Sequence, residues 1–290
     1  MNGIKSIYKK DLKIYFSTMT GWFFIAAVLL AGGVYVYINN FYYQNASFGE
    51  SINYISFFFV FLAPILGAGV FTDERRQKTD QLLYTMPIRS YEIVLGKYFA
   101  LITILAIPLV IIGIYPLIMS MYGEVNMLQA YTNLLAVFLL GMALFAICMF
   151  ISSLFENIVV SGLISFAVAF LLYQMNSFAE AFSTSASRSF MGLIILVVIY
   201  AIYVLCMTRN IFIAIIPSVI AAMILFLINN FKETLMAGRL NLVMSSIAIF
   251  KPLENFKAGI VDVYAIIYYV SIIALFVLFT IYTFERRRWK

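Results

Sequence analysis

Eight long apolar runs divide this chain, and each approaches the roughly 20 residues that an α-helix needs to cross a hydrocarbon core about 30 Å thick. None of the runs alternates between apolar and polar residues, as the strands of a membrane barrel do. They therefore predict helices, which satisfy their backbone hydrogen bonds internally in lipid. We predict an all-α polytopic membrane protein with about eight transmembrane helices, of which the fifth is the shortest. The runs cover Trp22–Ile38, Ile52–Phe71, Tyr98–Met119, Leu134–Leu154, Ile158–Tyr173, Phe190–Met207, Ile211–Ile228 and Val263–Thr283.

The composition also requires a membrane environment. Hydrophobic residues make up 64% of the 290 residues and charged residues 11%, whereas a soluble globule has roughly 45 to 50% and about 25%. No linker-like stretch interrupts the pattern, so we expect one transmembrane domain over residues 1–290. The chain has no histidine, which is the commonest metal ligand and general base, and no metal site is predicted. Cys148 and Cys206 lie deep in apolar runs, where they are expected to be packing residues.

Lysine and arginine indicate the orientation, because cytoplasmic segments carry an excess of both. With a cytoplasmic N-terminus, 14 of the 19 basic residues fall in cytoplasmic segments. An even number of spans returns the C-terminus to the same side, so we expect both termini in the cytoplasm. Membrane insertion accounts for the net charge of +6, and no nucleic-acid partner is expected. The 14 residues are Lys5, Lys9, Lys10, Lys13, Arg75, Arg76, Lys78, Arg89, Lys97, Arg209, Arg286, Arg287, Arg288 and Lys290.

Residues 1–20 predict a cytoplasmic helix that lies at the membrane interface and leads into the first span. Lysines occupy one side of this helix, and Asp11 is the exception on the other side. The apolar run that follows continues without a cleavage site, so the segment is not interpreted as a signal peptide. The apolar side holds Ile4, Ile7, Tyr8, Leu12, Ile14 and Tyr15, and the basic side holds Lys5, Lys9, Lys10 and Lys13.

A charged stretch at residues 73–97 separates the second and third apolar runs. We expect a helix from Asp73 to Thr85 with a charged first half, ended by Pro87, and a cap at Ser90 for the helix that enters the third span. Its second half has an apolar tip outside the membrane. A groove on a partner protein would bury such a tip, and the membrane surface is the alternative. The tip consists of Leu82, Leu83, Tyr84 and Met86.

Three segments carry a resemblance to a known family. The stretch "DERRQKTDQLLYTMPIRSYEIVLGKYFA" resembles the cytoplasmic loop of type-2 ABC exporter permeases, and "SSLFEN" is similar to the short turn between spans four and five of that family. The segment "ENFKAGIVDVYAIIYYVS" resembles the outer segment and last span of the gliding-motility-type branch. The family has a six-span core, to which Phe190–Ile228 would add a hairpin. The matching residues of the first stretch are Asp73, Glu74, Arg75, Thr79, Leu82, Leu83, Pro87, Gly96 and Lys97.

The resemblance implies a permease subunit of an exporter in the plasma membrane, paired with a second permease subunit that is either identical or different. A separate ABC ATP-binding subunit would carry ATP and magnesium. This chain has no phosphate-binding loop, because "LGKYF" lacks the upstream glycine and the hydroxyl of that motif, and it is not itself expected to be an enzyme. The residues expected to dock on the ATPase are Asp73, Glu74, Arg75, Arg76, Thr79, Leu82, Leu83, Tyr84, Met86 and Pro87.

Two further sites are expected. Glu156 and Asn157 are candidates for a second cytoplasmic contact with the ATPase, and a simple helix-end charge is the alternative for Glu156. The segment 229–262 mixes apolar residues with spaced charges, which predicts short helices at the outer membrane surface. Such helices would form either an extracellular gate or a plain connection. The gate candidates are Phe256, Gly259 and Asp262.

The acidic residues bear on how transport is driven. All thirteen fall at the ends of predicted spans or in loops, whereas ion-coupled carriers usually keep ionisable groups inside the membrane. This distribution favours energy supplied by a cytoplasmic partner. A membrane-embedded enzyme is disfavoured, because no carboxylates face one another at one depth. A carrier or scaffold that acts without ATP is the alternative function.

Overall fold

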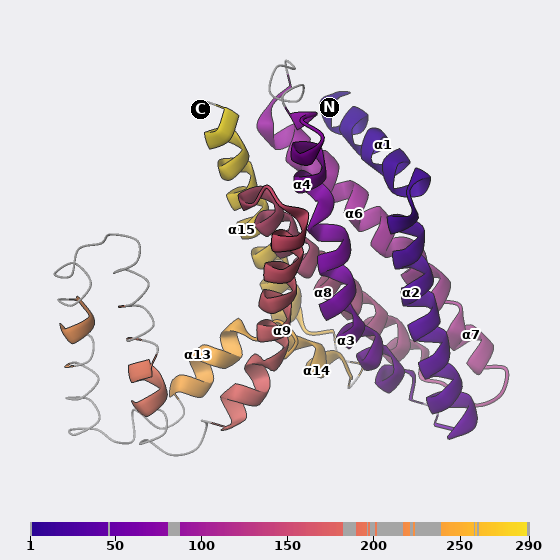
Figure 1. Cartoon of the computed structure of the whole chain (residues 1–290). Coiled ribbons are helices and arrows are strands. Elements are labelled where there is room, and N and C mark those ends of the chain that lie inside the picture. Colours follow the sequence, from indigo (N-terminus) through magenta and orange to yellow (C-terminus); the bar gives the residue numbers. More distant parts are fainter. Residues whose placement is uncertain are drawn as a thin grey trace. The chain divides into compact units, whose positions relative to one another are not determined.

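A computed structural model gives the fold of the chain, and within the residues that it describes the regular structure is helical (Figure 1). The described residues are 2–45, 47–80, 88–181, 190–195, 197, 201, 217–220, 223, 239–257, 259 and 261–288. They fall into two compact units. The first comprises Met1–Leu171 with Pro252–Lys290, and the second comprises Leu172–Lys251.

The first unit holds most of the helices. An N-terminal helix α1 precedes the first span, where α2 continues into the π-helical segment η1. The α3 helix is followed directly by α4, and further spans are formed by α6, α8, the start of α9 and α15. The bounds are α1 Asn2–Ser17, α2 Met19–Val36, η1 Tyr37–Tyr42, α3 Phe48–Gly67, α4 Gly69–Arg76, α6 Ser90–Ile112, α7 Tyr115–Met119, α8 Met127–Leu154, α9 Ile158–Ala181, α14 Pro252–Lys257 and α15 Val263–Arg288.

Six helices within the described residues are long and apolar enough to cross a membrane. They correspond to the first five predicted spans and the last one, and most extend beyond the apolar runs because their ends are polar. The fifth candidate span is longer than predicted, since it continues past Tyr173 to Ala179. The predicted sixth and seventh spans, Phe190–Met207 and Ile211–Ile228, lie largely outside the described residues. The six are Met19–Tyr42, Phe48–Arg76, Ser90–Met119, Met127–Leu154, Ile158–Ala179 and Val263–Arg288.

The α8 helix forms the centre of the first unit and packs against α3, α6 and α15. Small residues allow its neighbours to approach closely, as is usual where membrane helices pack. At Gly141, for example, an added Cβ would lie 2.8 Å from Leu105 of α6. Cys148 is a buried free thiol whose Cβ faces Gly67 of α3, which agrees with the predicted packing role. Cys206 lies outside the described residues.

The segment that follows the second span differs from the predicted helix over Asp73–Thr85. The α4 helix already begins at Gly69, as a continuation of α3, and ends at Arg76. A turn follows, in which Lys78 adopts a left-handed conformation with φ 57°, so the helix does not run unbroken through this region. The predicted apolar tip at Leu82, Leu83, Tyr84 and Met86, together with Pro87, lies outside the described residues.

The start of α6 also corrects a prediction. The N-cap residue is Arg89 rather than Ser90. The Arg89 backbone N–H donates to the Glu92 carboxylate at 3.2 Å. The acidic residue of the first turn therefore accepts the backbone N–H of the N-cap residue, as in a capping box. Ser90 is the first residue of the helix and is largely buried.

Both termini of the first unit lie at the same end (Figure 1). The Arg288 guanidinium donates to the Ile88 carbonyl at 2.8 Å. A Cβ added at Gly3 would lie 3.1 Å from the Ile88 side chain. This arrangement agrees with an even number of spans between the termini, and the side of the membrane on which they lie stays a prediction.

In the second unit the described regular structure includes the end of α9 and the helix α13, Arg239–Ile247. Tyr173 and Phe250 make an edge-to-face ring contact within this unit, with centroids 5.1 Å apart. Short helices are therefore present in the segment 229–262, as α13 in the second unit and α14 in the first. Their extracellular location stays a prediction.

Candidate functional site

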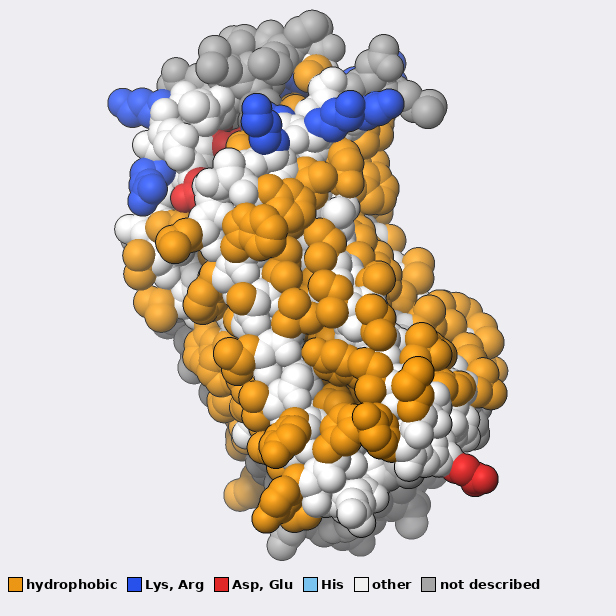
Figure 2. Space-filling model, turned by 90° about the vertical axis from the view of Figure 1, so that its right-hand side faces the viewer, with side chains coloured by type: hydrophobic (Ala, Val, Ile, Leu, Met, Phe, Trp, Pro, Cys, Tyr) orange, Lys and Arg blue, Asp and Glu red, His pale blue; other side chains and the backbone are white. Residues whose placement is uncertain are grey.

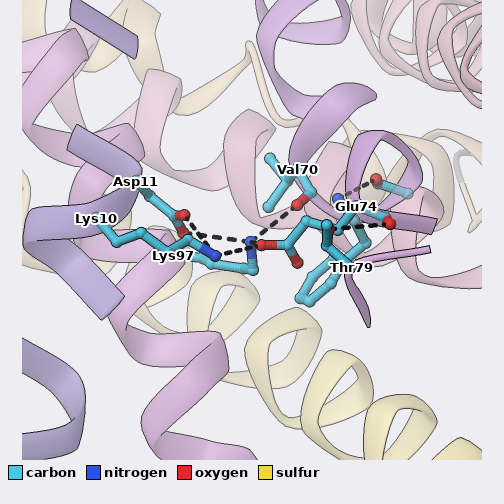
Figure 3. Close-up of polar contacts among 8 residues, drawn as sticks. Lys10, Asp11, Val70, Glu74, Thr79 and Lys97 are labelled. Atoms are coloured by element: carbon cyan, nitrogen blue, oxygen red, sulfur yellow. Dashed lines mark hydrogen bonds and ion pairs between the residues drawn. The ribbon is translucent and has the colours of Figure 1, made fainter. Parts of the chain in front are cut away.

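A buried lysine lies at the centre of a cluster of charges at the end of the first unit where the termini lie. Lys97 is in the second turn of α6, and its side chain is 3% exposed. Its Nζ lies 2.8 Å from Glu74 Oε1 and 3.2 Å from Asp11 Oδ2, and it donates to the Val70 carbonyl at 3.1 Å (Figure 3). The same Nζ lies 5.3 Å from the centre of the Phe71 ring, within the range of a cation–π contact.

A second lysine completes the cluster. Lys10 of α1 donates to Glu74 Oε1 at 2.6 Å and lies 3.5 Å from Asp11 Oδ1 (Figure 3). Two lysines thus balance two carboxylates, and they come from α1, α4 and α6. We call Lys10, Asp11, Glu74 and Lys97 the ionic cluster. Because Asp11, Glu74 and Lys97 are largely buried, loss of Lys97 would leave two carboxylates without their main partner in a low-dielectric site, at a cost of about 3 to 5 kcal/mol. The Lys10 side chain is 41% exposed, so water screens its contribution.

The glycine before Lys97 explains how α1 reaches the cluster. A Cβ added at Gly96 would lie 2.8 Å from the Ile7 Cβ and 3.0 Å from the Ile4 carbonyl oxygen. No side chain larger than hydrogen fits there while α1 stays in place. The Gly-Lys pair of "LGKYF" therefore has two structural roles. Gly96 allows α1 to approach α6 closely, and Lys97 pairs with the carboxylates of Asp11 and Glu74.

Tyr15 of α1 lies within electrostatic range of the carboxylates of the cluster. Burial, reinforced by the carboxylates of Asp11 and Glu74, raises the pKa of the Tyr15 phenol. The hydroxyl is therefore neutral and adds no charge to the ionic cluster.

Arg75 connects α4 to the C-terminus of α8. Its guanidinium donates to the carbonyls of Ser153 at 2.7 Å and Ser152 at 3.3 Å, and also to the carbonyl of Phe155. The last carbonyls of a helix have no partners within the helix and carry partial negative charge. The Ser152 hydroxyl adds a further link, because it donates to the Ala68 carbonyl at 2.7 Å, where α3 meets α4. The end of α8 is thus tied to α4 by several bonds.

The C-terminal arginines contact the same region. Arg287 donates to the Leu154 carbonyl at 2.6 Å and lies 3.9 Å from the Glu156 carboxylate, which is largely exposed. Asn157 caps α9, because its side-chain oxygen accepts the Val159 N–H at 2.8 Å. Asn157 therefore has a structural role and Glu156 has an ion pair within the chain. Their contact with an ATPase stays a prediction.

The predicted docking residues have different positions in the structure. Glu74 and Arg75 point into the chain, as members of the contacts described above. Asp73 is half-buried, and Arg76 and Thr79 are exposed. The other predicted docking residues, Leu82, Leu83, Tyr84, Met86 and Pro87, lie outside the described residues.

The gate candidates of the outer segment have structural contacts. Phe256 of α14 is fully buried. Gly259 has a φ of +76°, which favours glycine, and an added Cβ would lie 3.2 Å from Gln129 of α8. Asp262 caps α15, since its carboxylate accepts the Tyr264 N–H at 2.9 Å and the Asn255 amide at 2.6 Å. The contact at Gly259 lies against α8, and the Asp262 cap stabilises the first turn of α15. A gating role for these residues stays a prediction.

Sequence reasoning did not foresee the ionic cluster, although two of its members were conspicuous. Asp11 is the lone acid on the apolar side of the N-terminal helix, and Lys97 lies seven residues after the first residue of a span. A charged residue at such a position requires a partner of opposite sign. Applied to both residues at once, this rule would have suggested that they pair.

The surface of the molecule is also basic at one end. Figure 2 shows Lys and Arg side chains gathered at one end of the face it presents, and hydrophobic side chains over most of the remaining length. This distribution is typical of a membrane-spanning protein that has its basic residues at one of the two membrane surfaces.

Residues 8–289 match the family model described as ABC-2 family transporter protein. A comparison with curated proteins finds no match. The matched range contains the six candidate spans, the α4 segment and the second half of α1.

Proposed function

Since this chain belongs to the ABC-2 transporter family and is a membrane-spanning permease, we propose that it is the permease subunit of an exporter in the plasma membrane. In this proposal a separate ATP-binding subunit hydrolyses ATP, and the permease converts its motion into substrate translocation. Two permease subunits, identical or different, would pair above two ATPases. The gliding-motility-type branch, suggested by the residues Phe256 to Ser271, is part of the same proposal.

The observation that supports coupling is the set of contacts made by α4. The segment 73–87 follows a span directly, and its first residues are bonded to three other elements. Glu74 connects it to α1 and α6, and Arg75 connects it to α8. A push on this segment would therefore be transmitted to several spans together, as a lever requires.

ATP-driven closure of the ATPases would supply that push. The docked part would be the apolar tip at Leu82 and Leu83, with exposed Arg76 and Thr79 at the rim of the groove. Charge pairs at the rim of an interface favour orientation and rate of association more than affinity. Glu74 and Arg75 would then transmit the motion rather than contact the ATPase.

The test of this proposal is retention of the ATPase subunit in mild detergent. We expect Leu82→Asp combined with Leu83→Asp to abolish copurification, because two apolar side chains worth about 1.5 to 3 kcal/mol each on burial are lost and charge is introduced. Insertion should persist, since the pair is predicted outside the hydrocarbon. As a control, Ile194→Asp combined with Ile195→Asp, in a predicted span, should lower the amount of inserted protein.

Two outcomes contradict the coupling proposal. Equal ATPase recovery with the wild type and the Leu82/Leu83 variant, at equal expression, removes the docking role. Transport that continues without any ATPase subunit favours the alternative of a carrier that acts without ATP.

Orientation is tested by labelling single cysteines with an impermeant thiol reagent in intact cells. The background carries Cys148→Ala and Cys206→Ala, and the cysteines are introduced at Lys78, beside the ionic cluster, and at Gly123, which has open space around it. We expect Gly123→Cys to react and Lys78→Cys to react only after permeabilisation. The reverse pattern would place the charged end outside the cell.

A further inference from the structure

The structure divides the lysines of α1 into two groups. Lys10 is in the ionic cluster, where it pairs with Glu74 and Asp11. The other three, Lys5, Lys9 and Lys13, are exposed, and within the described residues they have no ion pair. We call these three the lysine row, because residues four apart lie on one side of a helix.

The lysine row points away from the bundle, because the opposite side of α1 packs on α6. Ile7 is buried and faces Gly96 of α6. The hydroxyls of Tyr8 and Thr103 lie 3.1 Å apart, which adds a hydrogen bond between the same helices. Asp11 is also on the packed side, so the single acid of α1 is not available to the row.

An uncompensated row of this kind is unfavourable in isolation. Like charges at i and i+4 destabilise a helix. The row contains two such pairs, Lys5 with Lys9 and Lys9 with Lys13. Anions held outside the chain would turn this repulsion into attraction, so the row is suited to an anionic surface.

An aromatic pair at the corner between α1 and α2 indicates which surface that is. Phe16 and Trp22 make an edge-to-face contact with centroids 5.6 Å apart, and the Trp22 indole N–H donates to the Phe16 carbonyl at 2.9 Å. Trp22 lies in the first candidate span and is 57% exposed, and Met19 beside it is 88% exposed. A tryptophan so placed is typical of the boundary between hydrocarbon and headgroups. Phe16 follows Lys13 by three residues, so the row ends at this boundary.

We propose that Lys5, Lys9 and Lys13 form a binding site for the phosphate-bearing headgroups of anionic phospholipids, in the leaflet whose boundary Trp22 marks. The ammonium groups contact the headgroup phosphates, and the corner of Phe16, Met19 and Trp22 lies against the upper acyl chains. Amphipathic helices with basic polar faces bind anionic bilayers in this manner. Each lysine near such a surface favours it by about fivefold in binding constant. The lipid would hold α1 in the position from which Lys10 and Asp11 reach the ionic cluster.

The two tryptophans of the chain provide the experiment. Trp289→Phe leaves Trp22 as the sole tryptophan, and this protein is reconstituted with phosphatidylcholine and phosphatidylglycerol. Brominated acyl chains, which quench tryptophan on contact, are carried by one lipid or the other at equal mole fraction. We expect brominated phosphatidylglycerol to quench Trp22 more strongly. The preference should shrink with salt, since the Debye length falls from about 30 Å at 0.01 M to about 8 Å at 0.15 M ionic strength.

Variants of the lysine row give the specific comparison. Replacing Lys5, Lys9 and Lys13 together by Gln should bring the two quenching efficiencies to about the same value. The triple replacement by Arg keeps the charge and should keep the preference. Lys78→Gln removes one exposed cation elsewhere at the same end and should change nothing.

Three outcomes overturn the proposal. The first is equal quenching of Trp22 by the two brominated lipids in the otherwise wild-type chain, a result that does not depend on any row variant folding. The second is a preference for phosphatidylglycerol that survives the triple Gln replacement. The third is loss of ATPase copurification in the triple Gln variant with lipid preference unchanged, which would assign the row to an acidic face of the ATPase.

Discussion

The two ends of the first unit are held together in different ways. At the end with the ionic cluster, polar contacts join residues that are far apart in the sequence. Lys10 and Glu74 are separated by 64 positions, Arg75 and Ser153 by 78, and Arg287 and Leu154 by 133. Each of these bonds connects two different helices, so α1, α4, α6, α8 and α15 form one connected network there.

At the opposite end, the polar contacts include many that are local. The Asn40 side chain accepts the Ser51 hydroxyl at 2.7 Å, 11 positions away. The Asn45 amide donates to Glu50 at 2.8 Å, 5 positions away. Asn126 caps α8 by accepting the Gln129 N–H. The Asn40–Ser51 bond joins η1 to α3, which are neighbours in the sequence, and the other two bonds lie in the turn between them or at the start of a single helix.

The difference between long-range and local polar contacts affects how far the helices at each end can move independently. We expect motion of one helix at the charged end to displace the others, because buried charges cannot be separated without a large cost in free energy. A local cap keeps its own turn intact and places little restraint on neighbouring helices. The comparison agrees with a proposal in which force enters at the charged end as a unit.

The largest effect is expected from Lys97→Met. The replacement keeps the length of the side chain but leaves the buried carboxylates of Asp11 and Glu74 without their main partner. We expect a loss of about 3 to 5 kcal/mol in the free energy of unfolding. Thermal unfolding of the reconstituted protein, and the amount of inserted protein, measure this loss.

Two controls make this prediction specific. Lys78→Met, which removes an exposed cation nearby, should leave stability within about 0.5 kcal/mol of the wild type. Adding Asp11→Asn and Glu74→Gln to Lys97→Met should recover much of the loss, because the one charge left in the cluster is that of Lys10, whose side chain is 41% exposed and can be solvated. Wild-type stability of the single Lys97→Met variant would show that the ionic cluster does not hold this end together.

An intermediate effect is expected from Gly96→Val. The new side chain would collide with Ile7 and with the Ile4 carbonyl, and overpacking of this kind costs about 1 to 3 kcal/mol. We expect α1 to separate from α6, which limited proteolysis near residue 10 would detect. Gly123→Val is the matched control from the opposite end, where nothing lies within 4 Å of the added Cβ. If the two variants are cleaved equally, the packing of α1 on α6 does not depend on Gly96.

The smallest effect is expected from Asp262→Ala at the opposite end. Loss of a helix cap costs about 1 kcal/mol, and the loss should stay confined to the start of α15. Hydrogen exchange should therefore increase over the first turn of α15 and remain unchanged at the ionic cluster. Asp262→Asn keeps an acceptor for the Tyr264 N–H and should behave almost as the wild type. Increased exchange at the charged end would contradict the idea that local caps restrain only their own helices.

Several features of the fold could be predicted from the sequence, and the misses have physical reasons. The apolar runs located six spans, since the hydrocarbon thickness fixes how many apolar residues a helix needs. Their ends were placed too far inward because polar residues continue a helix once the chain leaves the lipid. The break after Arg76 was not predicted. Lysine rarely adopts a left-handed conformation, so nothing in the sequence indicates that Lys78 does so.

The candidate site was found in part. The charged motif at Asp73 to Arg76 was identified, but the direction in which Glu74 and Arg75 point was not. Hydropathy shows only that charges lie near the end of a span. It does not distinguish a charge that faces a neighbouring helix from one that faces a partner, because both patterns look alike along the chain.

The sequence by itself determined that this protein lies in a membrane and is helical, because the cost of placing unpaired polar groups in hydrocarbon acts on each segment separately. It also indicated the family, because the motifs that carry the resemblance are local. Only the tertiary structure decided that Asp11 meets Lys97, that Gly96 admits α1, and that Lys10 pairs with Glu74 whereas the lysine row has no ion pair within the described residues. Those outcomes depend on distances between residues up to 92 positions apart, and such distances follow from helix packing, which no single segment encodes.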